Sequence, residues 1–119
     1  EQMESMRRVT AEAMEDGAFG VATALIYPPN SYSPDWELTE VARVVSRYGG
    51  IYVTHLRSEG DRLIEALEDA ITLARDADLP LEVYHLKATG ENNWPKMEAV
   101  IHRIDRARAA GVDVTADMY

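Results

Sequence analysis

The stretch GGIYVTHLRSEGDRLIEALEDAITLARDADLPLEVYHLK, residues 49–87, contains the pattern that decides the fold. Two short runs, IYVTHL at 51–56 and LEVYHL at 81–86, combine apolar, aromatic and β-branched residues directly after a glycine pair or a proline, which is typical of buried strands. Between them, Ser58 and Asp61 resemble a capping box at the start of a helix. The apolar residues of that helix recur at helical spacing: Leu63, Leu67, Ala70, Ile71 and Ala74. The stretch therefore predicts a strand–helix–strand unit.

The same alternation continues toward the N-terminus. Residues 19–27 (FGVATALIY) form a nearly continuous apolar run that a proline pair ends, which suits a strand buried on both faces. Ser33, followed by Pro34, is a suitable N-cap for a helix that ends at the glycines 49–50. Residues 1–16 place methionines at helical spacing, so we expect a further helix there, with its methionines in the core.

Toward the C-terminus, Asn93 can cap another helix, which ends before Gly111. Its apolar residues are predicted to share one buried face: Met97, Val100, Ile101 and Ile104. Residues 112–118 (VDVTADM) follow as a fourth strand. One helix followed by β-α-β-α-β-α-β predicts an α/β protein, in which right-handed crossovers connect the strands of a parallel sheet.

Two architectures have this order of elements. A doubly wound, flavodoxin-like sheet needs about the length of this chain, whereas a (β/α)₈ barrel needs roughly 250 residues, so the chain would form about half of one. Polar residues end the last three strands, at His55, His85 and Asp117, and both architectures place ligands at that edge of the sheet. No nucleotide-binding or phosphate-loop glycine motif follows any strand, which weakens the case for an open sheet. The chain begins at Glu1, within a predicted helix, and ends at Tyr119, directly after a strand, so both ends are expected to be truncated.

Composition limits the class of protein. The chain has 119 residues, of which 46% are hydrophobic and 28% are charged, as in one ordinary globular domain. The net charge of -9 argues against a nucleic-acid partner, because phosphate binding needs clustered lysine and arginine. There is no cysteine, and no apolar run approaches the roughly 20 residues of a membrane helix. We therefore expect a cytoplasmic protein without a membrane partner.

Two histidines occupy equivalent positions in successive units. His55 and His85 are 30 residues apart, and each is the fifth residue of its predicted strand. If these two strands are adjacent and in register, their spacing of about 4.8 Å lets both imidazoles reach one point above the sheet edge. Neutral imidazole is a common zinc ligand, and a catalytic zinc needs three protein ligands and a water, so the other ligands would lie outside residues 1–119. The alternative is that each histidine is a packed residue at a strand end.

Arg57 and Glu59 follow His55 closely and have two possible roles. They can orient the histidine ring or brace its loop, because residues that hydrogen-bond to a metal ligand fix its orientation. They can equally pair with Asp61 or Arg62 at the surface.

Two further polar residues need an interpretation. Asp117 is expected either to cap a loop or to lie near the pocket. His102 lies off the apolar face of its predicted helix and is expected to be a solvated surface residue.

Five short motifs occur in a fixed order along the chain: IYPP at 26–29, THLRSEGDR at 54–62, HLK at 85–87, NW at 93–94 and DVTAD at 113–117. In this order and spacing, they resemble the D-aminoacylase (N-acyl-D-amino-acid deacylase) family of the amidohydrolase superfamily. The resemblance covers residues 17–119.

The resemblance implies about half of a TIM-type (β/α)₈ barrel, whose strands ending at Tyr27, His55, His85 and Tyr119 would be the fourth to seventh. It implies that His55 and His85 bind zinc in the full-length enzyme. It also implies that Tyr27, Lys87 and Tyr119 contact the substrate. The alternatives are that Lys87 is a solvent-facing loop lysine and that Tyr27 is a wall residue packed by Pro28. The family's His-x-His pair, metal-binding cysteine and catalytic aspartate have no counterpart here, so no catalytic residue is expected in this segment.

The implied reaction is zinc-dependent hydrolysis of the amide bond of N-acyl-D-amino acids by a metal-activated water. Two alternatives stay open: another amidohydrolase of the dihydroorotase or hydantoinase type, and a freestanding flavodoxin-like binding module without metal. A half-barrel leaves two open sheet edges and an unfilled inner face, so it is expected to be inactive alone and to self-associate. A freestanding module would instead be a stable monomer.

Overall fold

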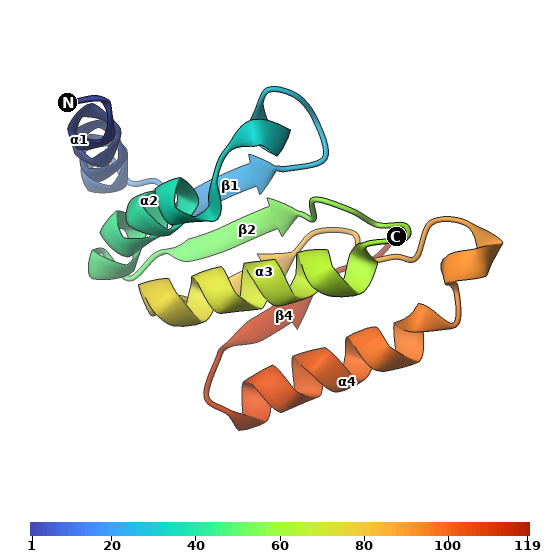
Figure 1. The fold of residues 1–119 in the computed structure, drawn as a ribbon. Coiled ribbons are helices and arrows are strands. Elements are labelled where there is room, and N and C mark those ends of the chain that lie inside the picture. The colour runs from blue at the N-terminus through green and yellow to red at the C-terminus, as the bar shows by residue number, and fades with distance from the viewer.

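Four short strands lie side by side in chain order and all run in the same direction (Figure 1). The computed structural model describes residues 1–119. The strands are Gly20–Ala24 (β1), Ile51–His55 (β2), Leu81–Val83 (β3) and Val114–Ala116 (β4). The helices are Gln2–Glu15 (α1), Asp35–Arg47 (α2), Leu63–Ala77 (α3) and Lys96–Ala109 (α4), with 3-10 helices at Asn30–Tyr32 (η1) and Glu91–Asn93 (η2). The predicted α/β class and parallel sheet are confirmed.

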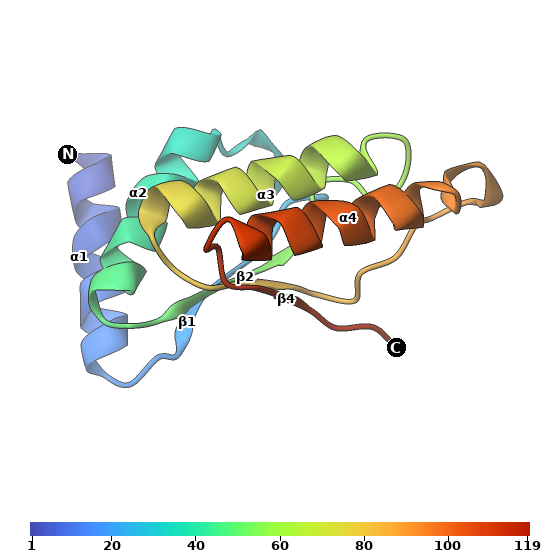
Figure 2. The ribbon, with the colours of Figure 1, turned by 90° about the horizontal axis from the view of Figure 1, so that it is seen from below.

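The helices α2, α3 and α4 cover one face of the sheet, and the opposite face carries no helix (Figure 2). This one-sided arrangement follows from three crossovers of the same hand between neighbouring strands. Helix α1 packs beside α2, where the Tyr48 hydroxyl donates a hydrogen bond to Glu15 Oε1 (2.8 Å) and Arg7 pairs with Glu40. None of the helices has the length and apolar character needed to cross a bilayer.

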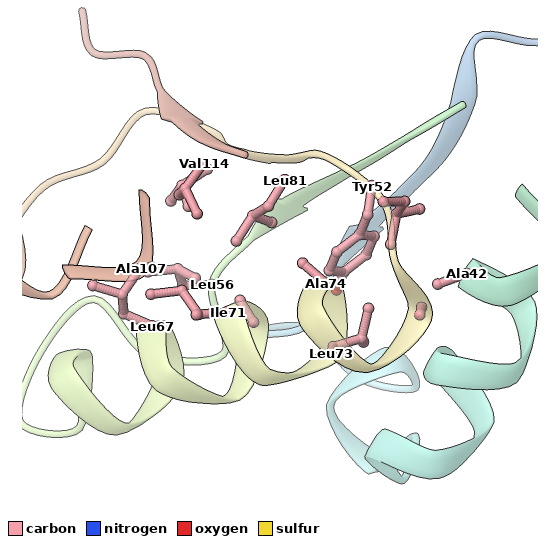
Figure 3. Close-up of a cluster of buried hydrophobic side chains, with 14 of the residues drawn as sticks. Ala42, Tyr52, Leu56, Leu67, Ile71, Leu73, Ala74, Leu81, Ala107 and Val114 are labelled. Carbon is pink, nitrogen blue, oxygen red and sulfur yellow. The ribbon is translucent and has the colours of Figure 1, made fainter. Parts of the chain in front are cut away.

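The core lies between the sheet and its helices. Tyr52, Leu81 and Val114 stand in register on three adjacent strands and are at most 1% exposed. From the strands, Leu81 and Val114 point toward apolar residues of the helices (Figure 3), which include Leu67, Ile71, Ala74 and Ala107. Burial of one such leucine or valine side chain contributes about 1.5–3 kcal/mol to stability, so this layer holds the strands in place.

The next residue of each strand belongs to the other face of the sheet. Ala22, Val53, Glu82 and Thr115 form an in-register row, and none of them is fully buried. Successive strand residues point to opposite faces, so this row lies on the helix-free face. In the predicted barrel, it would line the interior.

The strands are shorter than predicted. β1 ends at Ala24 and β3 ends at Val83, each three residues before the predicted end, and β4 ends at Ala116. The apolar runs continue beyond these ends because loop residues also pack into the core: Leu25 is buried, and Leu86 packs against the core cluster. Hydrophobic runs therefore overestimated the length of the strands.

The predicted N-terminal helix caps are wrong. The residues directly before α2, α3 and α4 are Pro34, Arg62 and Pro95, and none of them makes a side-chain cap. Ser58 Oγ instead accepts a hydrogen bond from the Gly60 N–H (3.3 Å), within the loop before α3. Asn93 is buried, and its Nδ2 donates to the Thr89 carbonyl oxygen (2.8 Å). Both side chains satisfy loop backbone groups, which competes with capping.

The buried faces of the outer helices are narrower than predicted. In α1, Met14 is buried but Met6 is 37% exposed, and in α4, Val100 is buried but Ile101 is 54% exposed. These helices lie at the two ends of the helical layer (Figure 1), so each has a neighbour on one side. The prediction that Met6 and Ile101 belong to the core is wrong for this reason.

Candidate metal centre

His55 and His85 meet at the carboxyl edge of the sheet. His55 is the last residue of β2, and His85 follows β3, the strand that pairs with β2. His55 Nδ1 lies 2.9 Å from His85 Nε2, and the ring centroids are 4.5 Å apart with the planes inclined at 71°. Adjacent parallel strands thus bring both imidazoles to one point, as their equivalent sequence positions predicted.

The backbone at His85 has an unusual conformation. Its φ of 39° is in the left-handed region, which few residues other than glycine adopt and in which asparagine, aspartate and histidine are enriched. The Asp117 carboxylate accepts a hydrogen bond from the His85 N–H, and the Asp117 carbonyl oxygen accepts one from the Leu86 N–H (2.8 Å). Asp117 therefore holds the loop that carries His85, which is the first of the two roles considered for it.

Glu59 is the residue that connects the cluster. It is 9% exposed, and its Oε1 lies 3.4 Å from His55 Nε2, 3.1 Å from His85 Nδ1 and 3.0 Å from Lys87 Nζ. A buried carboxylate needs partners of this kind, because an unpaired buried charge is costly. Of the two roles considered for Glu59, contact with the histidine rings is observed rather than a surface ion pair.

The three predicted substrate residues surround the histidines. Lys87 Nζ lies 2.9 Å from His85 Nδ1 and 5.2 Å from the ring centroid of Tyr119. The Tyr119 ring lies 5.9 Å from the His85 ring, and the Tyr27 ring lies 5.6 Å from the His55 ring. Both tyrosines are more than half exposed, so they stand at the rim of the cluster.

Burial and the neighbouring charges set the protonation of the cluster. Burial lowers the pKa of His55 below its ordinary value; Glu59 opposes this shift, and the neighbouring His85 and Lys87 add to it. Burial also acts to lower the pKa of Lys87, but its contacts with Glu59 and Tyr119 outweigh this effect and leave that pKa raised. His55 is therefore favoured in the neutral form that binds metals, and Lys87 in the charged form.

The cluster fits a divalent metal ion by its chemistry. His55, Glu59 and His85 each offer one ligand atom, and these atoms lie within 4.8 Å of one another. Two imidazole nitrogens and a carboxylate are a donor set that zinc accepts. The 2.9 Å between His55 Nδ1 and His85 Nε2 is also a suitable separation for two ligands of one ion at about 2.0–2.1 Å.

The chain is similar in sequence to known deacylases. No protein-family model matches the chain. The D-aminoacylase of Alcaligenes xylosoxydans xylosoxydans is 37% identical over 119 residues, and the N-acyl-D-glutamate deacylase of the same organism is 37% identical over 118 residues. These matches cover 100% and 99% of this chain but 24% of each relative. The chain thus spans about a quarter of the length of the curated relatives that it matches.

Solved structures agree with the sequence relatives. A crystal structure of D-aminoacylase matches with a TM-score of 0.93 at 32% identity, over 98% of this chain and 24% of that one. The N-acyl-D-glutamate deacylase from Bordetella bronchiseptica, solved with zinc and a phosphonate inhibitor, matches with a TM-score of 0.95 at 32% identity, over 98% and 25%. This chain is related to the D-aminoacylases. The predicted resemblance is confirmed.

The same comparison identifies the architecture. The D-aminoacylases are TIM-barrel amidohydrolases, so the four strands correspond to part of such a barrel, as predicted. An L-hydantoinase from Arthrobacter aurescens matches with a TM-score of 0.63 at 18% identity, over 91% of this chain and 28% of that one. At that identity, the likeness shows the shared fold alone.

In this relative of the D-aminoacylases, Arg57 braces the loop that follows Tyr27. Its guanidinium donates to the carbonyl oxygens of Ser31 (2.8 Å) and Ser33 (3.2 Å) and pairs with Asp35 (2.9 Å). Arg57 thus joins the loop after β2 to the loop after β1. The predicted bracing role is observed, whereas pairing with Asp61 or Arg62 is not.

His102 and the residues of one surface cleft lie away from the carboxyl edge of the sheet. The His102 side chain is 70% exposed and faces Glu98 at 4.0 Å, as predicted for a surface residue. A cleft of about 520 Å³ lies on the outer surface, where residues of α1, α2 and α3, including Arg7, Trp36 and Asp76, line it. The cleft is therefore separate from the histidine cluster.

Sequence reasoning named Glu59 but did not predict that one oxygen would face both rings and a lysine. Glu59 follows His55 by four residues in a loop, and no periodicity relates loop side chains to each other. The loop's folded path decides that contact.

Proposed function

We propose that residues 1–119 form the part of a zinc-dependent amide hydrolase that supplies two metal ligands, His55 and His85, for the cleavage of N-acyl-D-amino acids. One observation carries this proposal: two imidazoles from adjacent strands converge to 2.9 Å at the edge where barrel enzymes place their active sites. The names of the relatives, D-aminoacylase and N-acyl-D-glutamate deacylase, support the substrate class.

Zinc, when bound, lowers the pKa of a coordinated water toward about 7 and polarises the acyl carbonyl of the substrate. The residues of this chain then have distinct tasks. His55 and His85 hold the metal. The Lys87 ammonium attracts the free α-carboxylate of an N-acyl amino acid, since a charge-assisted contact of this kind is strong. Tyr27 and Tyr119 stand at the rim, where their hydroxyls can donate hydrogen bonds to the same substrate.

We infer that the general base and the remaining metal ligands belong to parts of a longer chain. The relatives are about four times as long as this chain, and two histidines and one carboxylate do not include a second acid or base aimed at the metal position. Residues 1–119 alone are then inactive, and no catalytic residue lies among them. They are a single partial barrel domain.

Self-association is a separate proposal for these residues in isolation. The helix-free face exposes Ala22 and Thr115, and β1 and β4 are open edges of the sheet. Open edges pair readily with other strands. Size-exclusion chromatography of residues 1–119 is expected to show dimers or larger species, and a stable monomer would contradict this. A cytoplasmic location stays a prediction.

The function is tested in a polypeptide of the relatives' length that contains residues 1–119. Its zinc content and its hydrolysis of a panel of N-acyl-D-amino acids, N-acyl-L-amino acids and cyclic amides are measured. We expect bound zinc and a preference for the N-acyl-D-amino acids. Hydrolysis of hydantoins or dihydropyrimidines in their place would favour the other amidohydrolase reaction. Full activity after metal removal, or in both His55→Ala and His85→Asn, would overturn the proposal.

A further inference from the structure

Both nitrogens of each histidine ring have a defined neighbour in the cluster. His55 Nδ1 and His85 Nε2 face each other at 2.9 Å. The other nitrogens, His55 Nε2 and His85 Nδ1, face Glu59 Oε1 at 3.4 and 3.1 Å. The histidine pair thus has two distinct sides. On one side, His55 Nε2 and His85 Nδ1 face Glu59; on the other side, His55 Nδ1 and His85 Nε2 face each other.

A divalent metal ion is unfavourable on the Glu59 side of the histidine pair, because the Lys87 ammonium lies there. Lys87 Nζ lies 3.0 Å from Glu59 Oε1 and 2.9 Å from His85 Nδ1, so a positive charge already stands beside the carboxylate. A divalent ion there would meet strong repulsion at such short range. The pair formed by His55 Nδ1 and His85 Nε2 has no such neighbour and is the better position for a metal.

The two nitrogens on the Glu59 side have different needs. The Lys87 ammonium donates to His85 Nδ1 (2.9 Å), whereas His55 Nε2 needs a hydrogen-bond acceptor. His55 Nε2 is buried and makes no hydrogen bond, and Glu59 Oε1 is the acceptor that faces it. Buried polar atoms without partners are rare in folded proteins, so this nitrogen requires an explanation. A proton on His55 Nε2, directed at Glu59, would leave the lone pair of His55 Nδ1 free.

We propose that Glu59 is a positioning residue that selects the tautomer of His55, so that His55 Nδ1 presents its lone pair to the metal. Lys87 balances the charge of this carboxylate. The inference rests on the proposed function, because it assigns Glu59 a role toward the metal that His55 and His85 would hold. A carboxylate behind a histidine ligand fixes the orientation of the ring and makes it a better donor.

The loop that carries Glu59 is firmly held, as this role requires. The Glu59 carbonyl oxygen accepts a hydrogen bond from the Thr89 N–H (2.7 Å). Lys96 Nζ donates to the Asp61 carbonyl oxygen (2.8 Å) and to Asn93 Oδ1 (2.5 Å). The loops after β2 and β3 are therefore tied together, which holds the Glu59 backbone beside the rings.

The test compares Glu59→Ala, Glu59→Gln and a matched control, Glu65→Gln, in the polypeptide of the relatives' length. Glu65 is an exposed glutamate that pairs with Arg62 and lies outside the cluster. Zinc affinity is measured by competition with a chelator, and the ligand set is followed by the visible spectrum of the cobalt-substituted protein. Circular dichroism checks that each variant folds.

We expect Glu59→Ala to weaken zinc binding about 10–100-fold, as is usual for the loss of an outer carboxylate. Glu59→Gln should weaken it less, because the amide oxygen can still accept a hydrogen bond from His55 Nε2. The cobalt spectrum should keep the wild-type shape in Glu59→Gln, since the ligands are unchanged. Glu65→Gln should match the wild type in every measurement.

Two results would overturn the inference while leaving the proposed function intact. Unchanged zinc affinity in Glu59→Ala would show that Glu59 has no role toward the metal. An altered cobalt spectrum in Glu59→Gln, with a loss of zinc as large as in His85→Asn, would show that Glu59 is itself a ligand. A wild-type protein that binds no zinc would instead remove both proposals.

Discussion

The strands of this sheet carry two regions of opposite character only a few residues apart. Tyr52 and Leu81 stand side by side under the helices and are at most 1% exposed, with apolar neighbours. His55 and His85, just beyond them at the carboxyl edge, have side chains 14% and 26% exposed and polar neighbours. The first region stabilises the fold by burying apolar surface, whereas the second places nitrogen and oxygen ligand atoms around one point. Changes in the two regions should therefore have separable effects.

The largest expected effect comes from a histidine at the edge. His85→Asn is the suitable change because asparagine tolerates the left-handed backbone that His85 adopts. Loss of a ligand should weaken zinc binding by more than about 100-fold, beyond the effect of an outer carboxylate, and reduce hydrolysis to background. The metal-free protein should keep its unfolding free energy to within about 1 kcal/mol. Retained zinc, measured by elemental analysis, would remove His85 from the metal site.

A change in the core should lower stability and leave zinc affinity unchanged. Leu81→Ala removes a fully buried side chain and should lower the free energy of unfolding by about 2–5 kcal/mol, measured by urea denaturation. The fraction that remains folded should bind zinc with wild-type affinity. A loss of affinity in folded Leu81→Ala would show that the core and the edge are coupled, and the separation would fail.

Arg57, which joins the loop after β2 to the loop after β1, should give an intermediate effect. Arg57→Leu removes the donors that reach the Ser31 and Ser33 carbonyl oxygens, at an expected cost of about 1–3 kcal/mol in unfolding free energy. The loop after Tyr27 should loosen, so KM for the substrate should rise more than kcat falls. An unchanged KM would indicate that this brace does not position the rim.

A smaller effect is expected from pH. Burial depresses the pKa of His55, so the folded protein binds fewer protons there than the unfolded chain when the pH falls below about 6.5. This contribution to stability is complete above about pH 6.5 and is lost as the pH falls through the lower folded-state pKa. Metal-free wild type should therefore lose more stability between pH 7.5 and 5.5 than His55→Gln does, by urea denaturation. Equal losses would contradict the assignment.

The smallest effect should come from the third histidine. His102 lies on the solvent side of α4, so His102→Gln should change the unfolding free energy by no more than about 0.5 kcal/mol and leave zinc content unchanged. A loss of zinc in this variant would show that the edge of the sheet is not where metal binds.

Much of this arrangement could be predicted because it depends on local order. The alternation of apolar runs with amphipathic stretches predicted the parallel sheet, and equal positions in successive units predicted that His55 and His85 would meet. The N-terminal helix caps were predicted poorly, since Ser58 and Asn93 satisfy loop backbone groups instead. The exposure of Ile101 was also missed, because burial depends on which neighbours a helix has.

The sequence by itself determined the class of fold and placed the two histidines at equivalent strand ends, because period and spacing act along the chain. The tertiary structure alone decided that the loop after β2 turns back so that one oxygen of Glu59 faces His55, His85 and Lys87. It also decided that Asp117 would hold the His85 backbone. Such contacts join loops from different units, and their geometry exists only once the sheet has fixed where each loop begins.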